Sequence, residues 1–259
     1  YFVETSGWES PGWYAGAGKV ADPGPDTWGR PAWWSRWELE HRAARENVIV
    51  MDMSFMGKFM VQGRDAGHCL NRISANNVDG AVGEITYTQW LNAQGRLEAD
   101  LTVTKLADDK FFVVVTDTMV RHAETWMKRN IPDGAHAFVT DVTSGYGQLN
   151  VQGPRSPDLL QSLTSVDLSN AAFPFRAARE IDIGYARVLC TRITYLGELG
   201  YELFIPTDQA VHVYDLVVAA GMEFGVVNAG LRALGSLRME KGYRDYGHDL
   251  DNTDDPYET

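Results

Sequence analysis

Short apolar runs typical of β-strands occur in pairs along this chain, and single helical segments separate the pairs. Neighbouring runs that are joined by a short turn form antiparallel hairpins. Helices inserted between hairpins indicate an α+β fold with mostly antiparallel sheets. We expect strands at 48–54, 57–62, 85–91, 97–105, 111–115, 137–142, 146–151, 181–185 and 186–195, a strand, turn and strand at 192–206, and helices from residue 35 and at 65–75, 119–129, 156–163, 208–221 and 230–241.

The order of these elements suggests an internal duplication. The series strand-strand-helix-hairpin-strand-helix-strand, found before residue 142, recurs loosely after it. We therefore expect one domain at 36–259 made of two ferredoxin-like halves, about 36–141 and 142–259. Residues 1–35 differ from the rest of the chain, because they are rich in glycine and proline and lack periodicity. Six of the eight tryptophans lie in residues 1–37. Aromatic side chains at this density seldom stay in water, so we expect an irregular Trp-rich arm or linker that packs along the body or against a domain outside this chain.

The composition excludes several classes of function. A net charge of −12 argues against binding to nucleic acid or to an anionic membrane surface, since both need a basic face. No apolar run approaches the roughly 20 residues of a membrane-spanning helix. Two cysteines are too few for a disulfide framework and fit a reducing compartment, which predicts a cytoplasmic protein, or a mitochondrial matrix protein in a eukaryote. Because the chain begins with Tyr1 rather than methionine, we expect it to be part of a longer polypeptide.

An acidic residue in an apolar strand marks the segment 192–206. Glu202 lies between Tyr201 and Leu203, past a turn bracketed by glycines. A carboxylate at a position that is at least half buried is costly unless it is paired or contacts a ligand. Glu202 is therefore either a buried polar residue with a protein partner or a ligand-binding residue. Glu198, in the turn itself, is more simply a solvated turn residue.

An aspartate also stands out, in the hairpin at 87–103. Tyr87 lies on one arm and Asp100 on the other, directly before a strong strand-forming run. Aspartate is disfavoured inside strands. Asp100 is thus a strand-edge residue, a cross-strand partner for an arginine or lysine, or a functional carboxylate.

Other motif matches fail on their context. The run Gly16-Ala-Gly18 resembles part of a dinucleotide-binding fingerprint, but no strand precedes it and prolines follow where a helix must begin. The acidic residues between Asp249 and Asp254 lack the glycine and the final glutamate of a calcium loop. The six histidines are scattered, which argues against a zinc site.

A set of segments occurs in a characteristic order: Glu40–Glu46, Asp52-Met-Ser54, Gly57-Lys58, Ala75-Asn76, Tyr87–Asp100, Val151-Gln-Gly-Pro154, Arg192–Glu202 and Leu237–Gly242. Taken together, these segments resemble the folate-binding aminomethyltransferase family, typified by the glycine cleavage T-protein. The resemblance covers most of residues 36–259. Its end, Leu237-Arg-Met-Glu-Lys-Gly242, and the Trp-rich arm are similar to the C-terminal half of sarcosine and dimethylglycine dehydrogenases.

The resemblance implies a function. The family transfers a one-carbon unit to tetrahydrofolate, and in the dehydrogenases an FAD-dependent amine oxidase domain precedes the folate domain. We therefore expect tetrahydrofolate as the cofactor, FAD only in a domain outside this chain, an amine-derived iminium as the one-carbon donor, and a C-terminal β-barrel domain after Thr259. The regulatory subunit of pyruvate dehydrogenase phosphatase has the same layout, so a non-catalytic role stays open, as does demethylation of another methyl donor.

The resemblance also implies roles for individual residues. Asp100 matches the family's essential aspartate and is the candidate catalytic residue. Tyr87, Tyr195, Glu202 and Met53 match positions around the folate, with Glu202 at the pterin edge. Where the glycine-cleavage enzymes carry an arginine, this chain has Leu234, which favours the amine-dehydrogenase subgroup.

Overall fold

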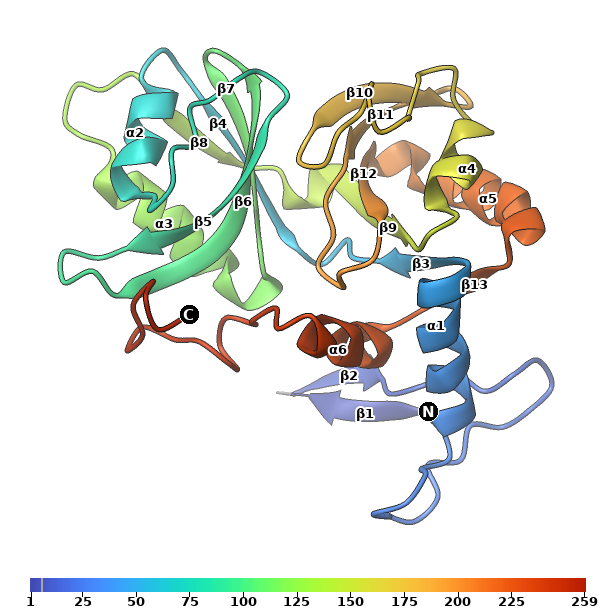
Figure 1. The fold of residues 1–259 in the computed structure, drawn as a ribbon. Coiled ribbons are helices and arrows are strands. Elements are labelled where there is room, and N and C mark those ends of the chain that lie inside the picture. The colour runs from blue at the N-terminus through green and yellow to red at the C-terminus, as the bar shows by residue number, and fades with distance from the viewer. Residues whose placement is uncertain (6) are drawn as a thin grey trace.

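Two β-sheets lie face to face at the centre of the computed structural model, which describes residues 1–5 and 7–259. Helices cover the outer face of each sheet, so the body has the layer order helix, sheet, sheet, helix (Figure 1). Among the strands described, all neighbours in the sheets are antiparallel except one pair at a sheet edge. The predicted α+β fold with mostly antiparallel sheets is confirmed.

The six-stranded sheet has the order β10-β11-β12-β9-β3-β13. Its outer face packs against α4 (Ser156–Gln161) and α5 (Ala210–Gly221), where alternate strand residues such as Val151 and Leu203 meet Val217 in one apolar core. The strands are β3 (Val48–Asp52), β9 (Tyr146–Gln152), β10 (Ala178–Ile183), β11 (Ala186–Thr191), β12 (Gly200–Pro206) and β13 (Val226–Asn228).

The five-stranded sheet has the order β5-β6-β7-β4-β8. Helices α2 (Ala66–Ile73) and α3 (Val120–Asn130) cover its outer face, and Phe59, Leu101 and Phe111 belong to the core beneath them. The strands are β4 (Gly57–Gln62), β5 (Ile85–Leu91), β6 (Leu97–Ala107), β7 (Lys110–Val115) and β8 (Phe138–Asp141), and short 3₁₀ turns occur at Asp117–Met119, Thr143–Gly145, Thr207–Gln209 and Met222–Phe224.

The chain crosses from one sheet to the other between β3 and β4. The sequence predicts these strands around a turn within the half 36–141, whereas the structure pairs β3 with β9 of the other sheet. Helix α1 (Trp34–Glu46) stays with β3, because Ala44 packs with Met51 and with α6 (Leu231–Glu240). The segment 34–52 therefore packs with the six-stranded sheet and not with the strands that follow it in the sequence.

The inner faces of the two sheets meet at an aromatic contact. Phe204 of β12 packs edge-on against Phe112 of β7, with ring centroids 5.0 Å apart, and Met60 and Val114 complete the cluster. Apolar burial at this contact fixes how the sheets face each other. Polar side chains occupy the inner faces beyond it.

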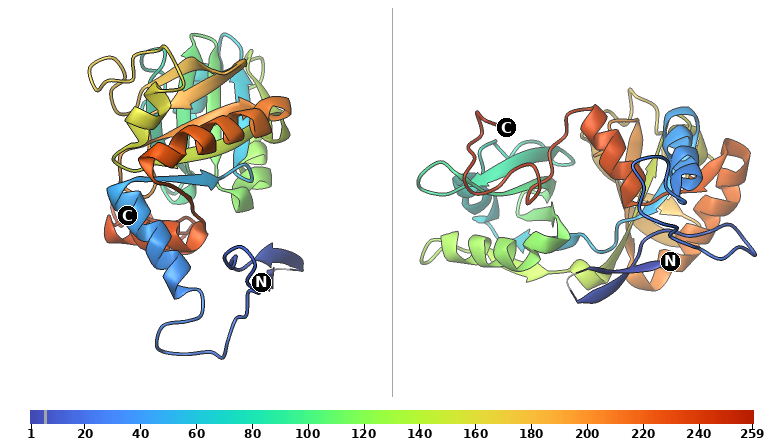
Figure 2. Two further views of the ribbon diagram at one scale, coloured as in Figure 1. Left: turned by 90° about the vertical axis from the view of Figure 1, so that its right-hand side faces the viewer. Right: turned by 90° about the horizontal axis from the view of Figure 1, so that it is seen from below.

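The Trp-rich arm contains a hairpin that the sequence does not predict. Strands β1 (Phe2–Thr5) and β2 (Trp8–Pro11) pair antiparallel, and the arm lies beneath the body beside α1 and α6 (Figure 2). The prediction of an entirely irregular arm was therefore wrong. Its contact with the body runs through Arg232 of α6, whose guanidinium lies 4.3 Å from the ring centroid of Trp33 and whose Nε donates to the carbonyl of Gly12.

Residues 192–199 form a loop, although the sequence predicts a strand as far as Tyr195. Strand β11 ends at Thr191 and β12 begins at Gly200. The Thr194 hydroxyl accepts hydrogen bonds from the backbone N–H groups of Leu196 and Gly197, both at 3.3 Å. A side chain that bonds the local backbone in this way competes with strand pairing.

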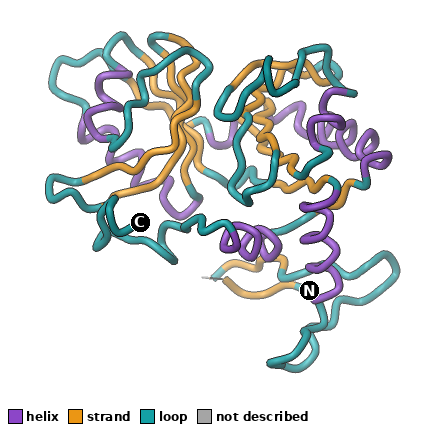
Figure 3. Tube along the Cα trace, in the orientation of Figure 1, coloured by secondary structure: helices purple, strands orange, loops and turns teal. Residues whose placement is uncertain are grey.

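The chain after α6 runs as a loop back to the β5–β6 hairpin (Figure 3). The guanidinium of Arg238 bonds the Tyr243 carbonyl and the Asp249 carboxylate at the start of this loop. Further along, Tyr246 Oη donates to the Leu97 carbonyl at 3.2 Å. This C-terminal segment, residues 242–259, therefore ties the helix of one half to the hairpin of the other.

Candidate functional site

The predicted site residues on the strands lie on the inner faces of the sheets. Leu101 and Val103 point into the outer core of the five-stranded sheet, so Asp100 points inward by strand alternation. Tyr87 also points inward, because it pairs with Thr102. On the other sheet, Leu203 points outward and Glu202 points inward. The two sheets thus present carboxylates from opposite sides.

A tyrosine and an aspartate form a hydrogen-bonded pair on the five-stranded sheet. Tyr87 Oη donates to Asp100 Oδ2 at 3.1 Å. Burial raises the pKa of the Asp100 carboxyl to about 6, although the Tyr87 hydrogen bond opposes this shift. Burial, followed by the nearby Asp100 charge, raises the pKa of Tyr87 well above its usual value. Asp100 is therefore held by a phenol rather than by the arginine or lysine that a structural cross-strand pair would use.

Glu202 faces an amide and, further away, a buried lysine. Asn150, directly opposite in the register of β9 and β12, donates from Nδ2 to Glu202 Oε1 at 3.2 Å. Burial raises the pKa of Glu202 to about 7, against the effects of Asn150 and of the Lys58 charge. Burial likewise lowers the pKa of Lys58 to about 8. Lys58 Nζ donates to the carbonyls of Ser54 (3.0 Å) and Met56 (2.8 Å), in the connector between the sheets.

Glu202 adjoins a row of buried amides that the sequence reasoning missed. Gln148, Asn150 and Gln152 alternate along β9 on the inner face, and each is at most 3% exposed. Gln148 Nε2 donates to Asn150 Oδ1 at 3.2 Å. Within the part of the chain that the structure describes, Gln148 Oε1 and Gln152 Nε2 have no hydrogen-bond partner. The pattern Gln-x-Asn-x-Gln, polar at every second position of a strand, marks one polar face in the sequence but does not indicate that this face is buried.

These groups fit the planar edge of a pterin. The edge offers N–H donors beside a carbonyl and ring nitrogens, so it needs a carboxylate together with neutral groups that both donate and accept. Glu202 would be the carboxylate of such a site. The row supplies one buried acceptor atom, on Gln148, and one buried donor atom, on Gln152, that the protein leaves unpaired.

Tyr195 and Met53 are neighbours at the end of this region. Met53 is buried in the apolar cluster that Tyr195 borders, and its N–H donates to the Gln148 carbonyl at 2.8 Å. The Tyr195 hydroxyl donates to the Arg244 carbonyl at 2.5 Å, and its ring stacks on Tyr243 with centroids 6.3 Å apart. Tyr195 is thus held by the C-terminal segment, which borders the site.

Glu198 forms ion pairs with two basic side chains, whereas the sequence suggests a solvated turn residue. Its Oε1 lies 3.8 Å from Arg45 Nη1 of α1 and 3.8 Å from Lys241 Nζ after α6. These ion pairs fasten the 192–199 loop to both helices. This gives Glu198 a positioning role for the loop that carries Tyr195.

Residues 1–5 and 7–259 contain neither a cluster of metal-ligating side chains nor a helix that could span a membrane. In that part of the chain, no three histidine, cysteine, aspartate or glutamate side chains gather in a way that could hold a metal ion. No helix there has the length and apolar character needed to cross a membrane.

Comparison with known proteins identifies the family to which this chain belongs. The model of the GCVT N-terminal domain matches residues 1–259. The 4-methylaminobutanoate oxidase (formaldehyde-forming) of Paenarthrobacter nicotinovorans is 37% identical over 257 residues, which are 99% of this chain and 31% of that protein. The mitochondrial pyruvate dehydrogenase phosphatase regulatory subunit of Mus musculus is 33% identical, over 99% of this chain and 30% of that protein. Mitochondrial dimethylglycine dehydrogenase of Homo sapiens is 32% identical, over 98% of this chain and 29% of that protein.

The chain thus spans less than a third of the length of these three relatives. Among solved structures, the glycine cleavage system aminomethyltransferase T of Bartonella henselae superposes with a TM-score of 0.78 at 22% identity, over 99% of this chain and 63% of that one. That superposition shows a shared fold, and the resemblance drawn from the ordered motifs is confirmed. The chain belongs to the glycine cleavage T-protein family of folate-dependent, aminomethyltransferase-type proteins.

Proposed function

We propose that this chain transfers a methylene unit to tetrahydrofolate from the iminium of an oxidised N-methyl amine. The Tyr87–Asp100 pair carries the proposal: a mostly buried carboxyl, held by a phenol at 3.1 Å, with a pKa of about 6. Such a group can exchange a proton near neutral pH. Capture of a cationic iminium by a folate nitrogen requires this, because that nitrogen loses a proton as it bonds the iminium carbon. The carbon is then released from the donor amine, which takes up a proton and leaves, while the second folate nitrogen bonds the same carbon and loses its own proton.

The cofactor would be held from the six-stranded sheet. Tetrahydrofolate would supply the nucleophilic nitrogen that accepts the one-carbon unit. Glu202 would accept two N–H groups of the pterin edge, and such charge-assisted bonds are stronger than neutral ones. Tyr195 and Met53 would pack against the ring, and Tyr87 would lie between the ring and Asp100.

Asp100 would stabilise the positive charge of the one-carbon donor and accept the proton that the folate nitrogen releases. At pH 7 a pKa of about 6 leaves the carboxyl mostly ionised. It can then stabilise the positive charge of the donor and take up the released proton. The Tyr87 hydroxyl fixes the orientation of the carboxylate by donating to Oδ2.

Substitution of Asp100 by asparagine tests this role. We expect Asp100→Asn to reduce formation of methylenetetrahydrofolate by about 100-fold or more, the range of a lost acid–base group, while folate affinity by calorimetry changes little. Asp182→Asn removes an exposed strand carboxylate on β10 and should leave both quantities unchanged. Unchanged turnover in Asp100→Asn would remove the basis of the proposal.

The one-carbon donor would come from an FAD-dependent amine dehydrogenase, on the same polypeptide or in a partner. Two of the relatives are named as an oxidase of a methylamino acid and a dehydrogenase of dimethylglycine, and both extend far beyond the matched region. These names support an N-methyl amine as the source. Such an enzyme would work in the cytoplasm or, as for the mitochondrial relative, in the matrix.

A non-catalytic regulatory module is the second candidate. The 33% identity to a phosphatase regulatory subunit over almost the whole chain favours it. The two candidates differ in turnover: a regulatory module would bind folate, or nothing, without forming methylenetetrahydrofolate. Retention of the Tyr87–Asp100 pair supports the enzymatic candidate.

A further inference from the structure

A buried lysine that the proposed mechanism does not use lies between the two sheets. Lys58 is 0% exposed. It lies on the inner face of β4, because its neighbour Phe59 belongs to the outer core and Met60, two residues on, belongs to the inner aromatic cluster. A buried ammonium is costly unless it is balanced by an opposite charge or contacts a ligand.

The ammonium of Lys58 is held by carbonyls and not by a carboxylate. Nζ donates to the carbonyls of Ser54 at 3.0 Å and Met56 at 2.8 Å, both in the connector 53–56 between β3 and β4. Among the described residues, no carboxylate oxygen lies within 4.0 Å of this nitrogen. Any charge that balances Lys58 therefore acts from a greater distance.

A continuous set of hydrogen bonds leads from Lys58 to Glu202. Ser54, whose carbonyl binds the ammonium, accepts the Gln148 backbone N–H at Oγ, at 3.0 Å. The Gln148 side chain donates to Asn150, and Asn150 donates to Glu202. The two charged groups thus belong to one polar network on the inner faces of the sheets.

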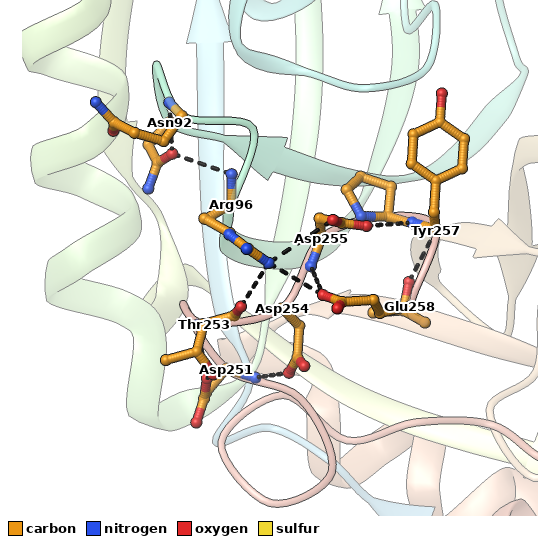
Figure 4. Close-up of polar contacts among 11 residues, drawn as sticks. Asn92, Arg96, Asp251, Thr253, Asp254, Asp255, Tyr257 and Glu258 are labelled. Carbon is orange, nitrogen blue, oxygen red and sulfur yellow. Dashed lines mark hydrogen bonds and ion pairs between the residues drawn. The ribbon is translucent and has the colours of Figure 1, made fainter.

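Another basic side chain that borders the site is already bound to acidic partners. Arg96 Nη1, at the tip of the β5–β6 hairpin, lies 3.0 Å from Glu258 Oε2 and 3.7 Å from Asp255 Oδ2, both in the C-terminal segment (Figure 4). The charge of Lys58, in contrast, acts on Glu202 and favours its ionised form.

We propose that Lys58 is the counter-ion that keeps Glu202 ionised for the pterin, and that it acts from a distance so that the carboxylate oxygens stay available to the ligand. This inference rests on the proposed function, since it concerns how Glu202 binds tetrahydrofolate. An ammonium in direct contact would occupy the lone pairs that the N–H groups of the pterin need. The carbonyls of Ser54 and Met56 hold Nζ away from that position. Lys58 is thus a positioning residue that acts through Glu202.

The arrangement divides the charges of the site between two tasks. Burial raises the pKa of Glu202 to about 7, and the Lys58 charge opposes this shift. Asp100, on the other sheet, is paired with the neutral hydroxyl of Tyr87. Asp100 therefore keeps its charge for the cationic one-carbon donor, while Glu202, balanced by Lys58, binds the neutral pterin.

The other titratable groups around Lys58 do not replace Glu202 as its partner. Asp52 and Asp141, whose charges also favour the ammonium, are exposed at the ends of β3 and β8, where water screens them. Above about pH 8 the ammonium itself loses its proton, so its effect on Glu202 fades. Also facing the pair are Tyr146, Gln148, Asn150 and Gln152 of β9, Thr191 of β11, Tyr195 of the 192–199 loop, and Tyr87 and Asp100 of the opposite sheet.

Ionisation of Glu202 can be followed directly on the full chain by carbon-13 NMR of carboxyl-labelled glutamate, with Glu202→Gln assigning the signal. Lys58→Met and Lys58→Gln both remove the charge, and glutamine keeps a donor for the connector carbonyls. We expect both variants to raise the titration midpoint of Glu202 by about one pH unit, the lower end of the effect of a lost opposite charge. Lys105→Met removes another buried lysine, paired with Asp79 at 2.7 Å, and as the matched control it should leave the midpoint unchanged.

Tetrahydrofolate affinity, measured by anaerobic calorimetry, tests the consequence for the ligand. A midpoint about one unit higher leaves about a third as much ionised Glu202 at pH 7.5. We therefore expect about threefold weaker binding in both Lys58 variants at pH 7.5 and nearly equal affinities at pH 9. In a Glu202→Gln background, Lys58→Met should cause no further loss. A purely structural role of Lys58 would instead weaken binding at both pH values and in both backgrounds, which would overturn the inference.

The converse measurement needs no Lys58 variant. Glu202→Gln should lower the pH at which Lys58 titrates, followed by its carbon-13-labelled Cε, because the coupling between two charges is reciprocal. An unchanged Lys58 midpoint in Glu202→Gln, or an unchanged Glu202 midpoint in the Lys58 variants, overturns the inference even where tetrahydrofolate binds. Shifted midpoints in a protein that binds no tetrahydrofolate support the counter-ion and defeat only the proposed function.

Discussion

Replacement of Glu202 by glutamine should stabilise the protein while weakening its ligand binding. The Glu202 carboxyl has a pKa of about 7 in the folded chain, against an ordinary value of 4.5, because it is buried with one hydrogen bond from Asn150. The folded state therefore holds this proton more tightly than the unfolded state. The stability that protonation contributes is complete below pH 4.5 and is lost as the pH rises to about 7.

The size of the effect follows from that difference in pKa. One pKa unit corresponds to about 1.4 kcal/mol, so this difference of roughly 2.5 sets an upper limit of about 3.5 kcal/mol on the destabilisation above pH 7. Access of water to part of the side chain reduces this, and we expect roughly 1–3 kcal/mol. Glutamine keeps an acceptor for Asn150 but carries no charge to bury. Lys58, with a pKa of about 8, stays mostly protonated up to about pH 7 and does not change the direction of the effect over that range. At pH 8 about half of it is deprotonated, so the expected gain there lies toward the lower end of these values.

Urea unfolding at pH 4.5 and at pH 8 measures how the free energy of unfolding differs between Glu202→Gln and the parent. We expect no gain in the free energy of unfolding at pH 4.5 and a gain at pH 8. Calorimetry should show tetrahydrofolate binding about 10- to 100-fold weaker, because the charge of the hydrogen-bond acceptor is lost. Glu180→Gln, at an exposed strand glutamate paired with Arg187, is the control and should show neither effect. A variant that is less stable at pH 8, or equally stabilised at both values, would refute the reasoning.

Three further changes probe the surroundings of the site. Tyr87→Phe removes the hydrogen bond that lowers the pKa of Asp100, so the acidic limb of the pH–rate profile should move above about pH 6. Gly197→Ala places a side chain at φ +82° against Lys241, and thermal unfolding should show a loss of about 1 kcal/mol. Arg238→Met leaves the Asp249 carboxylate and the Tyr243 carbonyl without their partner, so limited proteolysis should cut the C-terminal segment faster than in the parent.

Strand and helix order could be predicted from the sequence because it depends on local patterns. The β5–β6 hairpin, for example, needs only alternation and the turn at Gly95, whose φ is +77°. Sheet membership could not be predicted in the same way. Strand β3 pairs with β9, about 100 residues later, and a local turn between β3 and β4 looks the same in sequence as a crossing between two sheets.

The loop at 192–199 shows a second limit. Ile193 and Tyr195 favour strands, but Thr194 bonds the backbone of the next turn and Arg192 donates to the Phe173 carbonyl. These side-chain bonds hold Tyr195 against the C-terminal segment instead of in a sheet. Propensity describes the backbone of an isolated segment and does not include such partners.

The carboxylates of the candidate site could be predicted from the sequence, whereas its neutral amide groups could not. Asp100 and Glu202 are conspicuous because a charge in an apolar strand needs a reason, whereas Gln148 and Gln152 alternate with apolar residues as in any half-exposed strand. Their burial depends on the second sheet, which the sequence does not place. The two carboxylates have raised pKa values for the same reason, since each lies on an inner face that the opposite sheet shields from water. Face-to-face packing of the sheets therefore both lowers the stability of the ionised protein and gives the site two groups that titrate near neutral pH.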